Sequence, residues 1–337
     1  MSKNNDVIIS VKDLETYFYS GNRCNRVING VSLNIKRGKT LCIVGESGCG
    51  KSVTASCIMQ LLPNLARIEN GSIIYYDDDG NEIDISKLKR NGKQMRALRG
   101  KDIAMIFQDP MTALNPVYTI GTQLCEMIRS HEDVSKEEAR KRSIEMLRAM
   151  GIPQPDKRID QYPHEFSGGM RQRAMIAMAM LCNPKVLIAD EPTTALDVTC
   201  QAQIFDLIEK LKNEYGTGIL LITHDMGVVC EMADEVAVMY MGNVIESGTA
   251  REVLKAPSHP YTKALLSSIP VLGMGADQDL KPIRGATPDP YNRPKGCQFA
   301  PRCDYACEQC NVMPPETSLG GVHMVRCWKA KEVSTDG

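Results

Sequence analysis

The stretch Gly45-Glu46-Ser47-Gly48-Cys49-Gly50-Lys51-Ser52 constrains the fold more than any other part of the chain. It follows an apolar run at 41–44 that predicts a buried strand, and it precedes a run at 53–62 that is compatible with a helix. Glycines let the backbone curl so that successive N–H groups point at one anion, and a helix N-terminus adds partial positive charge there. In such a loop Lys51 reaches the β- and γ-phosphates, and the Ser52 hydroxyl ligates Mg²⁺. The sequence therefore predicts a phosphate-binding loop in an α/β fold, rather than a flexible Gly/Ser turn.

The size and charge of the chain exclude some classes of protein. With 337 residues it can form two or three domains of ordinary size. A formal net charge of −1 disfavours a dedicated nucleic-acid binder, because no basic excess is present to neutralise phosphates along a duplex. The N-terminus lacks the apolar core of a signal peptide, and no apolar run reaches the roughly 20 residues that span a bilayer. We therefore expect a soluble cytosolic protein.

The first hundred residues are rich in strand patterns. Short apolar runs at 7–9, 17–19 and 31–35, with a polar loop around 21–25, predict an antiparallel β layer. A further strand is expected at 72–76. The aromatic triplet Tyr17-Phe18-Tyr19 has two interpretations, core packing or a ring that stacks on a nucleotide base.

The middle of the chain changes character. A buried strand at 103–107 ends at Gln108, and helical patterns follow at 123–130 and 136–150. The second of these begins after an N-cap at Ser135 and closes at Gly151. This stretch predicts a helical insert between two halves of a nucleotide-binding core.

Polar residues then follow several predicted elements. Ser167-Gly168-Gly169 opens a helix, which makes a second anion-binding N-terminus. The strand at 186–189 delivers Asp190-Glu191 to the end of a parallel sheet where ligands bind. One carboxylate can hold Mg²⁺, and the other can orient the attacking water. The strand at 219–223, expected to be the last of the core, ends in His224, for which we favour a role in the site.

The order of these motifs resembles the ATP-binding-cassette (ABC) ATPases over about residues 7–255. The motifs in chain order are the loop at 45–52, Gln108, a signature at Phe166–Met170, Asp190-Glu191, Asp197 and His224. The resemblance implies an ABC-type P-loop ATPase core with an antiparallel β layer, a helical subdomain and an irregular Cys-rich C-terminal region. It also implies that ATP and Mg²⁺ are bound.

The same resemblance implies a role for each matched residue. Lys51 and Ser52 bind phosphates and Mg²⁺, with Asp190 assisting at the metal. Gln108 senses the metal and couples the site to a membrane partner. Glu191 is the catalytic carboxylate and His224 contacts the γ-phosphate. Phe18 is the best-aligned ring for stacking on the base, with Tyr17 and Tyr19 as the alternatives. The signature, including Ser167, Gly168 and Gly169, binds the γ-phosphate held by an opposite cassette, and Asp197 belongs to the same composite site.

A narrower resemblance covers nearly the whole chain. Segments 108–116, 190–199 and 258–266 resemble the ATPase subunits of bacterial dipeptide and oligopeptide importers, in particular the first of the two ATPases. This implies an ATP-hydrolysing subunit that powers peptide import, with nickel or another small solute as the alternative cargo. Its implied partners are a second homologous cassette in a heterodimer, two permeases and an extracytoplasmic peptide-binding protein, and no nucleic acid. Its implied location is the cytoplasmic face of a bacterial cell membrane. A soluble ABC ATPase acting on DNA or ribosomes is disfavoured, because the insert is too short for long coiled coils and the chain has one signature.

The resemblance divides the chain into three parts. Residues 1–110 and 166–255 form the ATP-binding core, residues 111–165 form a helical subdomain that contacts permeases, and residues 256–337 form the C-terminal extension. Residues 270–296 within the extension are rich in Pro, Gly and Asp and predict a linker or irregular arm.

Five of the thirteen cysteines lie between Cys297 and Cys327. Composition alone permits a disulfide knot, a zinc site or an iron–sulfur cluster, although disulfides are disfavoured in the cytosol. The importer resemblance implies a [4Fe–4S] cluster, with Zn²⁺ as the alternative; the implied ligands are Cys297, Cys303, Cys310 and Cys327. Cys307 is then a fifth cysteine that is not a ligand of the cluster. His323 is either a substitute ligand or, as we favour, an exposed loop histidine.

Cys49 occupies a position in the phosphate loop where serine is commoner. Its place beside bound phosphates and near Lys51 predicts a lowered thiol pKa and a reactive cysteine. We therefore expect alkylation to inhibit ATP binding, and ATP to protect.

Overall fold

The structure is a computed structural model, and it describes residues 6–109, 113–193, 197–268 and 283–335. Residues 110–112 and 194–196, within the importer-like segments 108–116 and 190–199, lie outside the described residues. So do residues 269–282, which include the first part of the linker predicted at 270–296. The chain divides into two compact units. The first takes its residues from Met1–Ile8, Ile35–Lys39 and Lys87–Leu221, and the second from Ile9–Asn34, Thr40–Ser86 and Ile222–Gly337.

The second unit contains the antiparallel layer that the sequence predicts. Its strand order is β2-β1-β4-β5, formed by β1 (Val7–Ser20), β2 (Arg23–Lys36), β4 (Ala66–Tyr76) and β5 (Glu82–Asp84). β1 and β4 run antiparallel, with Ile9 opposite Tyr75. The loop expected at 21–25 is only a two-residue turn, and Gly21 has the positive φ of 57° that tight hairpins use.

Five more strands of the second unit lie in the order β11-β12-β10-β9-β3. They are β3 (Thr40–Val44), β9 (Glu235–Tyr240), β10 (Asn243–Thr249), β11 (Thr317–Gly320) and β12 (His323–Val325). β3 is buried along its whole length and pairs in parallel with β9. The expectation that the strand at 219–223 ends the core is wrong, because β9 and β10 follow it as a buried hairpin.

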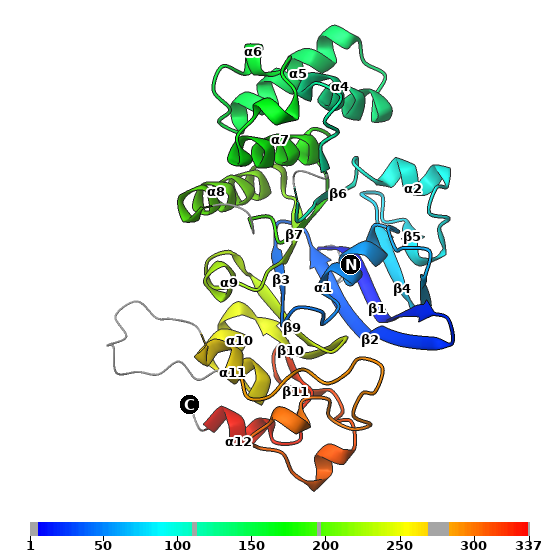
Figure 1. Cartoon of the computed structure of the whole chain (residues 1–337), viewed down its shortest axis with the longest axis vertical. Helices are drawn as coiled ribbons and strands as arrows, with labels where there is room; N and C mark the ends of the chain where they lie inside the picture. The colour runs from blue at the N-terminus through cyan, green and yellow to red at the C-terminus, as the bar shows by residue number, and fades with distance from the viewer. Residues whose placement is uncertain (1–5, 110–112, 194–196, 269–282, 336–337) are drawn as a thin grey trace. The chain divides into compact units, whose positions relative to one another are not determined.

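Short helices complete the second unit, and Figure 1 shows α1 directly after β3. The α-helices are α1 (Lys51–Ile58), α9 (Met226–Met232), α10 (Ala250–Lys255), α11 (Pro260–Ser267) and α12 (Ala330–Thr335). Three 3₁₀ turns are η1 (Ile85–Lys87), η3 (Ala300–Arg302) and η4 (Glu308–Asn311). The helix expected at 53–62 therefore starts at Lys51, inside the phosphate loop, and ends four residues earlier than expected.

The first unit combines parallel strands with most of the longer helices. Its strands lie in the order β8-β7-β6, with β6 (Ile103–Ile106) parallel to β7 (Val186–Asp190) and followed later by β8 (Gly218–Ile222). The helices are α2 (Lys93–Leu98), α4 (Ile120–His131), α5 (Lys136–Ala149), α6 (Pro155–Arg158), the 3₁₀ turn η2 (Pro163–Glu165), α7 (Gly168–Met180) and α8 (Val198–Tyr215). α4, α5 and α7 pack against one another (Figure 1).

The N-cap predicted at Ser135 is confirmed. The Ser135 hydroxyl accepts a hydrogen bond from the Glu138 N–H at the start of α5, which satisfies one of the N–H groups that a helix start leaves unpaired. Within the described ranges no helix is both long and apolar enough to cross a lipid bilayer.

Candidate functional site

The phosphate loop connects β3 to α1 in the second unit. Its first glycine, Gly45, has a φ of 149°, and a Cβ there would lie 2.2 Å from the Met239 carbonyl oxygen. Gly50 caps α1 with a φ of 108°. A side chain at either position would be strained or would clash, so the loop path requires glycine at both.

The Lys51 side chain folds back and contacts the backbone at the start of the loop. It is buried, and its Nζ lies 2.7 Å from the Gly45 carbonyl oxygen and 3.1 Å from that of Glu46. Ser52 lies on the first turn of α1, where its hydroxyl belongs to the same helix N-terminus. An ammonium, a helix N-terminus and a hydroxyl in one glycine-bounded loop fit a nucleotide triphosphate and its Mg²⁺.

Glu46 is held by residues far away in the sequence. Its carboxylate accepts hydrogen bonds from Arg302 and Thr287, and its N–H donates to the Tyr261 hydroxyl oxygen at 2.8 Å. Burial alone would raise the pKa of Glu46, but the hydrogen bonds from Arg302 and Thr287 and the charge of Arg302 outweigh it, so that the pKa lies below its ordinary value. The sequence does not predict this contact of Arg302, because nothing near Arg302 in the chain indicates a partner in the loop.

The prediction of a reactive Cys49 is wrong. The side chain is only 5% exposed, and burial raises the pKa of its thiol despite the opposing charge of Lys51. The ammonium lies 3.9 Å from the sulfur, but its closer contacts are to loop carbonyls. Desolvation of the thiolate therefore outweighs the neighbouring cation.

The aromatic triplet alternates along β1. Tyr17 donates a hydrogen bond to Glu15 and its ring faces the Arg26 guanidinium, with 5.4 Å between the guanidinium carbon and the ring centroid. Phe18 is on the opposite face of the strand, the face on which the Thr16 hydroxyl lies 3.2 Å from the Cys57 sulfur of α1. Phe18 is therefore the ring on the α1 side of the strand, and its stacking on a nucleotide base stays a prediction.

His224 follows β8 and is exposed. Next to it, the Thr223 N–H donates to the Ile43 carbonyl oxygen of β3 at 3.3 Å, and the Asp225 carboxylate caps α9. The backbone around His224 is therefore anchored beside the strand that leads into the phosphate loop.

In the first unit the structure brings Gln108 and Glu191 together. Gln108 Nε2 donates to Glu191 Oε2 at 2.9 Å. Asp190 is the last residue of β7 and is buried. The next residue, Glu191, has a backbone φ of 46°. This left-handed conformation is uncommon for a residue with a side chain and often marks a functional position. Here it follows the last strand residue directly, where the chain leaves β7.

The signature residues start α7 as expected. The exposed Ser167 hydroxyl accepts a hydrogen bond from the Met170 N–H, and Gly168 is exposed beside it. Phe166, the first residue of the signature, is buried. Asp197 caps α8 by accepting a hydrogen bond from the Cys200 N–H at 2.9 Å.

The C-terminal cysteines converge although they are spread over thirty residues. Burial, and then the charge of neighbouring thiols, raises the pKa of Cys327 to about 12; the thiols concerned are Cys297, Cys303 and Cys310. Cys307 and Cys310 have their sulfurs 3.7 Å apart, and every cysteine is a free thiol. Within the described part of the chain, however, no three His, Cys, Asp or Glu side chains are arranged to hold a metal ion.

The expectation that His323 is an exposed loop histidine is wrong, whereas its alternative role as a substitute metal ligand stays a prediction. His323 is buried, and its Nε2 lies 2.8 Å from Glu246 Oε1. The sequence could not show this contact, because Glu246 is on β10, 77 residues earlier in the chain.

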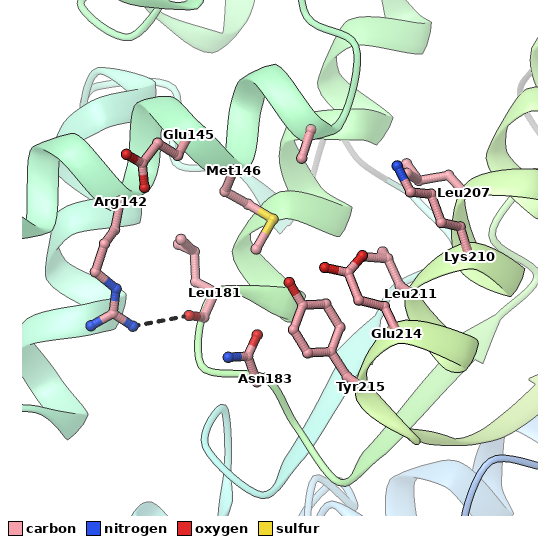
Figure 2. A pocket seen from close by; sticks show the side chains of 11 residues that line it. Arg142, Glu145, Met146, Leu181, Asn183, Leu207, Lys210, Leu211, Glu214 and Tyr215 are labelled. Carbon is pink, nitrogen blue, oxygen red and sulfur yellow. Dashed lines mark hydrogen bonds between the residues drawn. The ribbon is translucent and has the colours of Figure 1, made fainter.

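The first unit also has a hollow of about 350 Å³ that contains none of the predicted site residues. Figure 2 shows Arg142 and Met146 of α5 on one side and Leu211 and Tyr215 of α8 on the other. The Arg142 guanidinium donates to the Leu181 carbonyl oxygen at 3.3 Å in this hollow (Figure 2).

The fold and the loop together define a P-loop nucleotide-binding protein. The model of the ABC transporter family matches residues 28–194, and that of the oligopeptide/dipeptide transporter C-terminal region matches residues 245–310. The dipeptide transport ATP-binding protein DppD of Bacillus subtilis is 48% identical over 95% of this chain and 94% of its own length. The oligopeptide transport ATP-binding protein OppD of the same species is 47% identical over 95% of this chain and 88% of its own. The chain therefore belongs to the ABC transporter family of ATP-binding proteins, in the branch with the oligopeptide/dipeptide transporter C-terminal region.

Solved structures confirm the ABC ATPase fold. A dimeric ATP-binding cassette, MJ0796, bound to ADP and Pi matches with a TM-score of 0.63 and 28% identity, over 72% of this chain and 99% of that one. The structure of cbiO1 from Clostridium perfringens, part of an ABC transporter complex, matches with a TM-score of 0.61 and 30% identity, over 74% of this chain and 91% of that one.

Proposed function

We propose that the protein is the ATP-hydrolysing subunit that powers import of dipeptides or oligopeptides through an ABC transporter. The observation that carries this proposal is the similarity to DppD and OppD, which extends beyond the ATP-binding core through the C-terminal region. The relatives cited above are named for peptide transport, and no observation favours nickel or another small solute as cargo.

The phosphate loop supplies the binding part of this activity. The residues Gly45, Glu46, Ser47, Gly48, Cys49, Gly50, Lys51 and Ser52 surround the phosphates in the proposal, with Phe18 against the base and His224 at the γ-phosphate. Ser52, Gln108 and Asp190 are the proposed Mg²⁺ ligands. Bound Mg²⁺ would neutralise charge that develops on the phosphate oxygens.

Glu191 is the proposed catalytic carboxylate. A carboxylate acting as general base orients and polarises the attacking water. Gln108 donates a hydrogen bond to one Glu191 oxygen at 2.9 Å, which orients the carboxylate. In the proposal Ser167, Gly168, Gly169 and Asp197 complete the corresponding site of a partner cassette.

The proposed partners are a second, homologous ATP-binding subunit in a heterodimer, two membrane permeases and an extracytoplasmic peptide-binding protein. The proposed location is the cytoplasmic face of the cell membrane. The helical subdomain at 111–165 is the proposed permease contact. Within it, α4 and α5 border a hollow of about 650 Å³ whose lining includes Arg129, Arg140 and Glu126. The other two proposed domains of the chain are the ATP-binding core, at residues 1–110 and 166–255, and the C-terminal extension at residues 256–337.

Replacing Glu191 by Gln tests the proposal. In the transporter assembled with its partners, we expect ATP turnover to fall by about 10²–10⁴-fold, the usual contribution of a general base. ATP binding should persist, because the variant keeps the shape of the side chain. Lys51→Ala is the matched control, which should lose binding itself. Undiminished turnover in the Glu191→Gln transporter would exclude the assignment.

For the C-terminal thiols we propose a [4Fe–4S] cluster held by Cys297, Cys303, Cys310 and Cys327, with Zn²⁺ as the alternative. The support is the sequence pattern of the tail and the convergence of four free thiols. Four cysteine ligands are what such a cluster requires. The side chains as they stand do not form a metal cage.

Anaerobic purification followed by iron, sulfide and zinc analysis distinguishes the alternatives. A cluster predicts about four iron and four sulfide per chain with visible absorption, and zinc predicts one Zn²⁺ per chain without it. Cys303→Ser should lower the metal content, whereas Cys24→Ser, at an exposed cysteine of β2, should not change it. A metal-free wild-type chain would contradict both.

A further inference from the structure

Arg302 forms a paired contact with the phosphate loop. Its Nη1 donates to Glu46 Oε2 at 2.7 Å and its Nη2 donates to Glu46 Oε1 at 2.9 Å. Two parallel N–H···O bonds between a guanidinium and a carboxylate fix direction as well as distance. The two residues are 256 positions apart in the chain, and both belong to the second unit.

The guanidinium is itself held rigidly. The Arg302 side chain is 5% exposed. Its Nε donates to the Arg284 carbonyl oxygen at 3.1 Å, and Nη1 also lies 3.3 Å from the Tyr240 hydroxyl oxygen. Its guanidinium carbon lies 5.9 Å from the ring centroids of both Tyr240 and Phe299. These contacts leave the arginine with little rotational freedom, so it can impose a position on Glu46.

Glu46 is held through its backbone as well as its side chain. Its N–H donates to the Tyr261 hydroxyl oxygen at 2.8 Å, and its carbonyl oxygen accepts from Lys51 Nζ at 3.1 Å. The Tyr261 ring packs against Phe299 with the centroids 5.3 Å apart. Glu46 therefore contacts both Arg302 and Lys51, so a substitution of Arg302 that displaces Glu46 also alters a contact of Lys51.

We propose that Arg302 is a positioning residue for nucleotide binding, which holds the phosphate loop in its binding shape through Glu46. This inference rests on the proposed ATP-binding function of the loop. It gives the C-terminal region a role in the nucleotide site of its own chain. The loop must present several N–H groups to one phosphate chain, and a displacement of Glu46 misaligns its neighbours Gly45 and Ser47.

Nucleotide titrations on purified full-length chains test this role. We compare wild type, Arg302→Gln, Glu46→Gln and the double variant. A fluorescent ATP analogue gives Kd on the purified chains, and steady-state ATP turnover of the transporter assembled with its partners gives KM and kcat. Removing a charge-assisted pair should weaken nucleotide binding by about tenfold. Because catalysis at saturation depends on other residues, kcat should change less than about threefold. Since the two residues act as one unit, the double variant should be no weaker than either single variant.

The chain offers a closely matched control. Arg326 also immediately precedes a clustered cysteine, Cys327, and pairs with Glu316 at 2.9 Å, but Glu316 is not in the loop. Arg326→Gln should leave the nucleotide Kd unchanged. Arg302→Lys keeps the charge without the paired geometry, and should recover only part of the affinity.

The outcomes separate this inference from the proposed function. If wild type does not bind the analogue, or Lys51→Ala binds it equally well, the ATP-binding function itself fails. If wild type binds but folded Arg302→Gln binds equally well, Arg302 has no positioning role. Equal losses in Arg302→Gln and Arg326→Gln would also overturn the proposal, because they would indicate general damage to the C-terminal region. Circular dichroism and unfolding temperature verify that each variant is folded.

Discussion

At the scale of single residues, Cys49 shows that burial can outweigh a neighbouring charge. The loop position suggests a thiol activated by Lys51, but the side chain is enclosed and its thiol pKa is raised. The thiolate is the reactive form of cysteine, so a raised pKa and low exposure both slow alkylation.

We predict that Cys49 reacts slowly in the folded chain. With iodoacetamide at neutral pH, peptide mapping by mass spectrometry should show Cys49 modified at least about tenfold more slowly than exposed Cys24 or Cys230. In denaturant the rates should converge. Labelling of Cys49 as fast as that of Cys24 in the folded chain would contradict the buried position.

The positions of residues within the sequence motifs were predictable from the sequence. Lys51 and Ser52 begin α1 directly after the glycine-rich loop, as the motif predicts, and Gln108 donates a hydrogen bond to Glu191. His323 and Arg302 were not predictable in this way. Their partners, Glu246 and Glu46, are distant in sequence, and only the folded chain brings each pair together.

At the scale of elements, the start of α11 contains a buried histidine. His259 caps this helix, with its Nδ1 accepting a hydrogen bond from the Tyr261 N–H at 3.0 Å. Burial lowers the pKa of His259 from 6.5 to about 3. The folded chain therefore keeps this side chain neutral at pH values where the unfolded chain protonates it.

This difference predicts acid sensitivity. As pH falls from 6.5 towards 3, the unfolded state takes up a proton that the folded state does not, so the free energy of unfolding decreases. The loss is at most about 1.4 kcal/mol per pH unit for one proton. His259→Asn, whose side-chain oxygen can still cap α11, should show a shallower decline in urea unfolding between pH 7 and 5. Exposed His164→Asn should decline as wild type does, and parallel curves for wild type and His259→Asn would disprove the assignment.

Most elements were predictable because their signals are local. The α5 cap at Ser135 and the apolar run of β7 each combine pattern and boundary within a few residues. β9 has a comparably apolar run, but it was not predicted because the core was expected to end at 223; β10 is mostly polar and carries a weaker signal. The three-residue β12 has too little length for a periodic signal, and it forms by pairing with β10.

At the scale of the whole molecule, Glu246 joins three distant parts of the second unit. From β10 it accepts hydrogen bonds from the N–H groups of Ser258 at 2.7 Å and His259 at 3.0 Å, and it lies 2.8 Å from His323 Nε2 of β12. The residue is 1% exposed. A buried carboxylate with three partners stabilises the attachment of the C-terminal region to the core.

We predict that Glu246→Gln lowers the free energy of unfolding by about 3 kcal/mol, because an amide NH₂ would face buried N–H donors. Glu316→Gln, in the half-exposed pair with Arg326, should cost less than about 1 kcal/mol. Urea unfolding of both variants measures the difference. Equal small losses would mean that the buried contacts contribute little.

Local patterns in the sequence predict the ABC-type order of motifs and the strand and helix that flank the phosphate loop. These depend on short-range chemistry: glycine conformations, helix N-termini and apolar periodicity. The folded chain alone shows that Cys49 is buried, that His323 pairs with Glu246 and that Arg302 holds Glu46. Those outcomes depend on desolvation and on contacts between residues far apart in the chain, and no local pattern encodes them.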